Sequence, residues 1–195
     1  MKLNEPLETS FEFEGKTFEI DCSFDVVLDV FEMFGDDVLN DVEKLQLAIE
    51  IMTGEVIDDP GLASQIWKYI DEHFITVKKD PVIYDRQGNP MPVVDEDDKA
   101  RLIDFEIDAQ DIYASFIQAY GINLLDEQGK LTWAEFMALL NGLPDDTSMM
   151  KIVQIRSWKP SSHDSSEYKG LMRKLQRKYS LDREENNIGR WKNNH

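Results

Sequence analysis

Apolar positions recur at helical spacing through most of this 195-residue chain. Side chains three or four residues apart share one face of an α-helix, and such a stripe is typical of a helix packed on a core. In the segment 98–158 the stripes predict three consecutive helices. Their apolar positions are Leu102, Phe105, Ala109, Ile112, Phe116 and Tyr120 in the first, Trp133, Phe136, Met137 and Leu140 in the second, and Met150, Val153 and Trp158 in the third.

Residues typical of helix ends support these boundaries. Gly121 supplies the left-handed residue that commonly ends a helix. Thr132 and Glu135 have the spacing of a capping box, in which the hydroxyl and the carboxylate satisfy backbone N–H groups at a helix start. Asp146 or Thr147 is placed to cap the third helix. The segment 98–160 is therefore predicted to form a central three-helix module.

The N-terminal segment changes to a period of two. Residues 11–13 and 18–20 alternate apolar and acidic side chains around the turn 14–17, which predicts a β-hairpin with one wet face. An isolated hairpin is marginally stable, so its Phe face is expected to pack on the helices that follow. An exposed edge strand would equally suit pairing with a second copy of the chain.

Three further helices are predicted between residues 23 and 75. Ser23 is placed to cap the first, and Asn40 with Glu43 suggests a capping box at the second. Asp59 followed by Pro60 is a strong start for the third. The apolar positions expected in the core are Phe24, Val27, Leu28, Phe31, Phe34, Leu45, Leu47, Ile49, Met52, Leu62, Ile66, Trp67, Ile70 and Phe74.

Two stretches break the helical pattern. Residues 76–97 contain three prolines and fit either a linker or a short irregular hairpin. The C-terminal stretch 161–195 begins as a linker and continues as a basic amphipathic helix. The predicted fold is mainly α: a helical domain with a small N-terminal β-hairpin and a basic helical C-terminal tail. The predicted segments are 1–75, 76–97, 98–160 and 161–195.

Charge is distributed unevenly along the chain. The formal net charge is −18, yet residues 149–195 carry 11 Lys and Arg against 5 Asp and Glu. The acidic part is expected to repel nucleic acid and anionic membranes. The basic tail suits an acidic partner or a nucleic acid, and equally the chain's own acidic part. No apolar run approaches the roughly 20 residues of a membrane span, and no secretory signal is recognisable. With one cysteine, Cys22, the expected compartment is cytoplasmic.

Candidate metal and catalytic sites fail on closer reading. Aligning Gly129 with position 6 of a calcium loop puts Glu135 at position 12 but Leu124, which has no side-chain oxygen, at position 1. The capping box explains Glu135 better. Three aspartates three or four residues apart are expected to form a polar helix face, since the histidine of di-metal bundles is missing; they are Asp104, Asp108 and Asp111.

No catalytic motif accompanies the remaining reactive side chains. The sequence lacks GxSxG, P-loop, GxGxxG and HExxH patterns. His73 suits a partner for the carbonyl end of its helix, and Cys22 suits a small buried apolar side chain. We therefore expect no enzymatic activity, no metal and no cofactor.

Residues 102–158 resemble a known family of phage proteins. The resemblance rests on Asp104-Phe105-Glu106 with Asp108, on residues 112–116 leading to residues 120–124, on residues 131–136 continuing to residues 139–143, and on Arg156 after the third helix. On these motifs the chain is similar to the bacteriophage gene-product-fifteen family, encoded near the tape-measure gene of long-tailed phages (siphophages) and prophages of Gram-positive bacteria. The acidic N-terminal part is similar more loosely.

The resemblance implies a phage tail assembly chaperone. Such a protein binds the tape-measure protein, helps recruit the major tail protein and leaves before the virion matures. It would act in the cytoplasm of the infected or lysogenic host, without binding nucleic acid or membrane, and with self-association open. The alternatives are a structural tail component or adaptor of the virion and a small regulatory binding protein. The candidate partner-binding residues are Trp133, Phe136, Met137, Arg156, Trp158, Arg173, Lys174 and Arg177.

Overall fold

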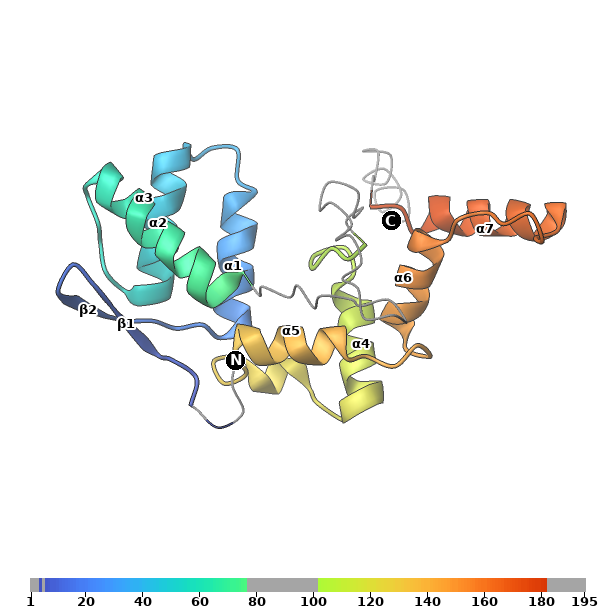
Figure 1. Ribbon diagram of the computed structural model, residues 1–195, viewed down its shortest axis with the longest axis horizontal. Coiled ribbons are helices and arrows are strands. Elements are labelled where there is room, and N and C mark those ends of the chain that lie inside the picture. The colour runs from blue at the N-terminus through green and yellow to red at the C-terminus, as the bar shows by residue number, and fades with distance from the viewer. Residues whose placement is uncertain (1–3, 5, 77–101, 182–195) are drawn as a thin grey trace, which may run out of the picture. The chain divides into compact units, whose positions relative to one another are not determined.

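The computed structural model describes residues 4, 6–76 and 102–181 and divides the chain into two compact units (Figure 1). Unit 1 comprises Met1–Pro81 and Ile122–Gly142, and unit 2 comprises Val82–Gly121 and Leu143–His195. The second predicted helix of the segment 98–158 lies in unit 1, whereas the first and third lie in unit 2. The predicted domain boundaries stay a prediction, and the predicted linker at 76–97 falls almost wholly outside the described residues.

Unit 1 begins with the predicted hairpin. Strands β1 (Ser10–Phe13) and β2 (Lys16–Glu19) pair antiparallel, with Phe11 opposite Phe18. The turn is two residues shorter than the predicted 14–17, because Glu14 and Gly15 both adopt positive φ angles, as a two-residue hairpin turn requires. The rings of Phe11 and Phe18 stack with centroids 5.1 Å apart, and Phe11 also packs on Tyr69. The predicted packing of the Phe face on helices is therefore confirmed.

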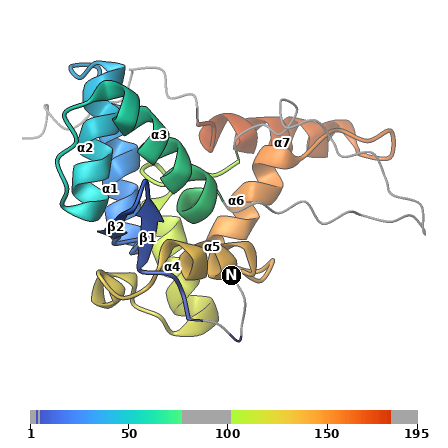
Figure 2. The same ribbon diagram turned by 60° about the vertical axis from the view of Figure 1, so that its left-hand side comes forward.

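Helices α1 (Phe24–Phe34), α2 (Asp41–Thr53) and α3 (Pro60–Ile70) follow, and α3 runs into the π-helical turn η1 (Asp71–Ile75). The views of Figures 1 and 2 show the three α-helices side by side. The capping box at Asn40 and Glu43 and the Asp59 cap before Pro60 are both confirmed. Fully buried aliphatic side chains form the centre of this layer: Val27, Val30, Ala48, Ile49, Ala63, Ile66 and Ile70.

Ser23 precedes α1 as predicted, but the expectation that its hydroxyl caps the helix is wrong. A short antiparallel bridge joins Ser23 to Thr132, and the Phe24 N–H donates to the Leu131 carbonyl at 2.9 Å. A backbone carbonyl thus takes the N–H at the start of α1. The Ser23 hydroxyl is buried and finds no hydrogen-bond partner within the described part of the chain.

The remaining elements of unit 1 come from the segment 122–142. A 3-10 turn, η3 (Leu124–Glu127), leads through this bridge into α5 (Trp133–Asn141). Helix α5 packs on α1 and η1. The rings of Phe24 and Phe136 stack at 5.0 Å, and the Trp133 indole N–H donates to the Ile75 carbonyl at 3.0 Å. These contacts join two stretches more than 50 residues apart in sequence.

Unit 2 contains α4 (Ala109–Tyr120), α6 (Ser148–Ser157) and α7 (Ser166–Lys178). The apolar stripe of the predicted first helix began at Leu102, and the prediction is wrong for this first part, because residues 102–108 are not α-helical. The Asp104 carboxylate accepts the N–H groups of Glu106 and Ile107, at 3.0 and 2.9 Å. Such a local side-chain-to-backbone turn competes with helix formation.

Helices α4 and α6 pack on each other, and polar contacts join them at the start of α6. The Ser115 hydroxyl of α4 accepts the Met149 N–H at 3.0 Å, and the Ser148 hydroxyl hydrogen bonds to the Asp111 carboxylate. The predicted caps for this helix are wrong in their chemistry. Thr147 holds the N-cap position, but its hydroxyl donates to the Pro144 carbonyl instead. An α4 side chain therefore satisfies an α6 N–H that a local cap would normally take.

Candidate partner-binding surfaces

The eight candidate residues are divided between the two units. Trp133, Phe136 and Met137 lie on α5 in unit 1. Arg156 is on α6, Trp158 follows it, and Arg173, Lys174 and Arg177 are on α7, all in unit 2. Each unit therefore holds its own subset of the candidates.

In unit 1, two of the three candidates belong to the core. Trp133 and Phe136 are buried, and Met137 is half-buried. The Trp133 ring stacks on Phe136 and meets Phe31 edge to face, at centroid distances of 5.6 and 5.4 Å. Their burial is explained by packing alone, because aromatic side chains contribute large apolar areas to a core. Their role in partner binding stays a prediction.

In unit 2, Arg156 lies at the centre of a polar network. Its Nη1 is 2.5 Å from Asp108 Oδ2 and its Nη2 is 2.8 Å from Asp108 Oδ1, a two-point pairing of guanidinium and carboxylate. Nη1 also donates to the Leu102 carbonyl at 2.8 Å, and Nε donates to the Tyr179 carbonyl at 2.6 Å. One side chain of α6 thus joins the start of α4, the segment before it and the end of α7.

Asp108 is almost fully buried, with 2% of its surface exposed. The expectation that Asp104, Asp108 and Asp111 form a polar helix face is therefore wrong for Asp108, which is buried, and for Asp104, which lies before α4. Oδ2 of Asp108 also accepts the Asp104 N–H at 2.9 Å, so both oxygens are engaged. A buried charge persists only when paired and hydrogen bonded. The network gives Arg156 a structural role that the sequence did not reveal, because its partner lies 48 residues earlier.

Helix α7 carries the exposed members of the candidate set. The Ser165 hydroxyl caps it by accepting the Tyr168 N–H at 3.1 Å. Met172 is buried on the side that packs against α6, and the Gln176 amide donates to the Trp158 carbonyl at 2.8 Å. The predicted amphipathic helix is confirmed, and half-buried Trp158 meets the Tyr168 ring edge to face at 6.0 Å.

The outer side of α7 is cationic and partly apolar. Arg173, Lys174, Arg177 and Lys178 are exposed. Leu171 and Tyr168 are also exposed, by 52% and 43%. Within the described residues, no carboxylate lies within ion-pair distance of these four cations. We call Tyr168, Leu171, Lys174 and Lys178 the α7 stripe, since spacings of three and four residues align them along one side of the helix.

The connection between α1 and α2 forms a second exposed surface, which the sequence analysis did not single out. Residues 36–43 contain four acidic side chains and no basic one, and all four are exposed. Val38 is 87% exposed and Val42 is 39% exposed. We call residues 36–43 the acidic corner. Figures 1 and 2 show it at the end of α1 and α2 that is remote from α5. The signal for this surface in the sequence was the position of both valines among acidic residues.

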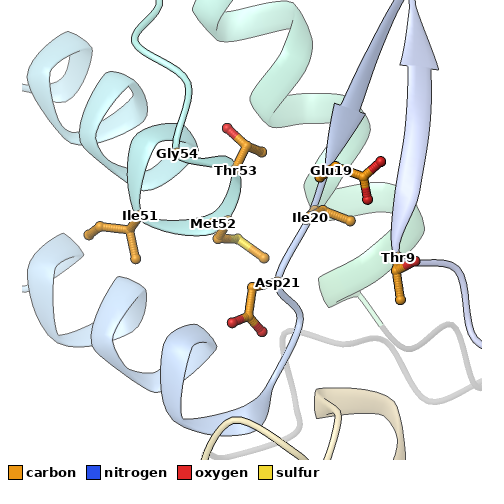
Figure 3. Close-up of a pocket in the computed structure, with 8 residues that line it drawn as sticks. All are labelled: Thr9, Glu19, Ile20, Asp21, Ile51, Met52, Thr53 and Gly54. Atoms are coloured by element: carbon orange, nitrogen blue, oxygen red, sulfur yellow. The ribbon is translucent and has the colours of Figure 1, made fainter.

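A shallow hollow of about 350 Å³ lies between the hairpin and the end of α2 (Figure 3). Its lining includes the carboxylates of Glu19 and Asp21 and the left-handed Gly54 that ends α2. The Asp21 N–H donates to the Met52 carbonyl at 2.8 Å, which holds the two walls together. The hollow is lined by Thr9, Glu19, Ile20, Asp21, Ile51, Met52, Thr53 and Gly54. Both ionisable side chains in this lining, Glu19 and Asp21, are acidic.

Two of the residues considered for metal binding and catalysis, Glu135 and His73, take part in local hydrogen bonds. Glu135 Oε2 accepts both the N–H and the hydroxyl of Thr132, at 3.0 and 2.7 Å, which confirms the capping box. His73 Nδ1 is hydrogen bonded to the Tyr69 carbonyl one turn earlier, at 2.9 Å. Burial, with the nearby Asp21 charge second, raises the pKa of the Cys22 thiol to about 12. Across residues 6–76 and 102–181, no cluster of three or more His, Cys, Asp or Glu is arranged to hold a metal ion.

The remaining findings concern membranes and known proteins. No helix in the described ranges is both long enough and apolar enough to cross a bilayer. The family model described as Bacteriophage Gp15 protein matches residues 3–181 of the chain. No curated protein and no solved structure matches it.

Proposed function

The chain belongs to the bacteriophage Gp15 family, and from that premise we propose that it is a phage tail assembly chaperone that binds the tape-measure protein. In this role the protein keeps its long client soluble, assists assembly of the tail tube with the major tail protein, and is absent from the mature virion. It acts in the cytoplasm of the host, without catalysis or cofactor.

The observation that carries the proposal is the exposed outer side of α7. A capped amphipathic helix with its cationic side open to solvent is suited to hold a helical segment of another protein. Three of the predicted partner-binding residues, Arg173, Lys174 and Arg177, lie there. The net charge of −18 supports the same role, because a large net charge favours solubility.

Co-expression with the tape-measure protein tests the proposal. We expect the wild-type chain to co-purify with the client and to raise its soluble fraction. The variant Arg173→Glu/Arg177→Glu is expected to lose most of both effects. A control with the same change of charge, Lys151→Glu/Lys159→Glu, alters exposed residues outside α7 and is expected to behave like the wild type.

Failure of the wild-type chain to bind or solubilise the client would exclude the chaperone function. Mass spectrometry of purified phage particles distinguishes the alternative of a virion component, which requires the chain to be present in stoichiometric amounts.

A further inference from the structure

The α7 stripe and the acidic corner are complementary in charge and in exposed apolar groups. Helix α7 carries five basic side chains and one acidic one, whereas the acidic corner carries four acidic side chains and no basic one. Each surface also exposes two apolar groups, Tyr168 and Leu171 on α7, and Val38 and Val42 at the corner. Exposed apolar groups surrounded by charge are a common feature of protein interaction sites.

We propose that the α7 stripe of one copy docks on the acidic corner of a second copy, so that the chain associates head to tail. Leu171 and Tyr168 then cover Val38 and Val42, while Lys174 and Lys178 face the carboxylates of the corner. Opposite charges around an apolar centre favour contact between α7 and the acidic corner. Contact between two α7 helices is disfavoured, because like charges brought face to face repel.

Two other acidic stretches with an exposed aliphatic residue fit α7 less well. Beside Val56, the Glu55 carboxylate is already 2.7 Å from the Lys16 ammonium. Beside Leu125, Lys130 adds a positive charge and its ammonium donates to the Asp126 carbonyl. The acidic corner is preferred because it combines two exposed valines with four exposed acids, and the nearest base, Lys44, is half-buried and donates to the Phe34 carbonyl.

A nucleic acid is the less favoured occupant of α7. Leu171 and Tyr168 are exposed beside the cations, and exposed apolar side chains suit a protein surface better than a phosphate backbone. The proposed contact joins two different surfaces, and every copy has both. Such a heterologous interface produces a ring when the rotation closes and an open chain when it does not. This association does not depend on the proposed client.

Sedimentation velocity of the purified full chain tests the proposal. We expect the mean mass to rise with protein concentration at low salt. At about 0.5 M salt the Debye length is only a few ångströms, so the mass is expected to fall toward that of the monomer. Lys174→Glu/Lys178→Glu and Asp37→Lys/Asp41→Lys are each expected to shift the association midpoint at least tenfold to higher concentration. Circular dichroism and thermal unfolding show whether each variant is folded.

Charge exchange separates a direct contact from a general charge effect. Mixing the two reversed variants, or combining all four substitutions in one chain, is expected to restore association. Lys151→Glu/Lys159→Glu, with the same change of charge as the α7 variant, is expected to leave it unchanged. Val38→Ser is expected to weaken association, whereas its matched control Val56→Ser is not.

Three results would overturn the inference. The first is a monomeric mass at every concentration in low salt. The second is association that persists in both reversed variants. The third is binding of a short duplex DNA that Lys174→Glu/Lys178→Glu abolishes, without any effect on mass, which would assign α7 to nucleic acid. Each result leaves the client-binding experiment independent, because that experiment measures the solubility and recovery of the tape-measure protein.

Discussion

Arg156 and Asp108, 48 residues apart, form a two-point ion pair inside unit 2, with nitrogen-to-oxygen distances of 2.5 and 2.8 Å. Removal of one partner leaves the other charge buried and uncompensated, which typically costs about 3–5 kcal/mol. We therefore expect Arg156→Ala and Asp108→Ala each to lower the free energy of unfolding by about that amount. Urea unfolding followed by circular dichroism measures it.

The double variant Arg156→Met/Asp108→Leu provides the contrast for this pair. Replacing both charges with apolar groups of similar size is often nearly neutral. It should therefore be more stable than either single variant. Arg173→Ala, on the exposed side of α7, should stay within about 0.5 kcal/mol of the wild type, as surface substitutions usually do. Equal stability of the single variants and the wild type would contradict the structural role given to Arg156.

Thr132 and Ser23 lie opposite each other in one bridge but should respond differently to loss of their hydroxyls. Thr132→Ala removes half of a capping box and is expected to cost about 1 kcal/mol. Ser23→Ala removes a buried hydroxyl that has no partner among the described residues, so it should be neutral or slightly stabilising. Thermal unfolding of the two variants compares them directly, and a larger loss for Ser23→Ala would disprove this account.

Cys22 should be a poorly reactive thiol in the folded chain. Only the thiolate reacts, and burial raises the thiol pKa to about 12 from 9.0. We expect labelling by a thiol reagent at pH 8 to be at least about tenfold slower in the folded protein than in urea. A labelling rate that urea does not change would show that the thiol is open to solvent.

The same pKa fixes the sign of a pH effect on stability. The folded chain holds the Cys22 proton more tightly than the unfolded chain does. The contribution of this thiol to the free energy of unfolding is therefore complete below about pH 9 and declines as the pH rises toward about 12. The Cys22→Ala variant should therefore lose less of its free energy of unfolding over this alkaline range than the wild type does. A pH series of chemical unfolding, run on both chains, measures the difference.

Trp133 was predicted from sequence as a partner-binding residue and lies in the core of unit 1. We expect Trp133→Ala to cost about 3–5 kcal/mol, the usual range for a large aromatic side chain removed from a core. Trp133→Phe removes the hydrogen bond to the Ile75 carbonyl and is expected to cost about 1–3 kcal/mol. If the role is packing alone, folded Trp133→Phe is expected to match the wild type in the proposed co-purification with the tape-measure protein. A lower affinity in that folded variant would restore a partner-binding role.

Local signals in the sequence predicted local structure well. The Asn40 and Thr132 capping boxes, the Asp59-Pro60 start and the hairpin depend on residues within a few positions of one another, and the structure contains all of them. The helix predicted from the apolar stripe beginning at Leu102 was too long, because the spacing of apolar residues does not show where a local turn interrupts the helix. Asp104 closes a turn on its own backbone, so an apolar stripe continues where the helix does not.

Long-range pairings could not be predicted from spacing. The Asp108 carboxylate was predicted to belong to a polar helix face, because its counter-ion Arg156 lies 48 residues later on α6. The hydroxyl that accepts an N–H at the start of α6 comes from Ser115 on α4. The central segment read as one module because its three helices are consecutive. Contacts of α5 with α1 and η1 depend instead on aromatic partners such as Phe24, which lies about a hundred residues earlier. Exposure of the α7 cations followed from amphipathicity, whereas the acids beside Val38 only hinted at the exposure that the structure shows.

The assignment of Ile122–Gly142 to unit 1 has a consequence for synthesis and for fragment design. As the chain leaves the ribosome, unit 1 lacks α5 until residue 142 has emerged, although Met1–Pro81 was translated long before. Until then, Phe24 and Phe31 lack the aromatic partners that α5 provides. A fragment that ends at Gly121 keeps that deficit permanently and is expected to aggregate. A fragment designed to fold as unit 1 must carry residues 122–142 as well, joined to the first stretch by an engineered connection.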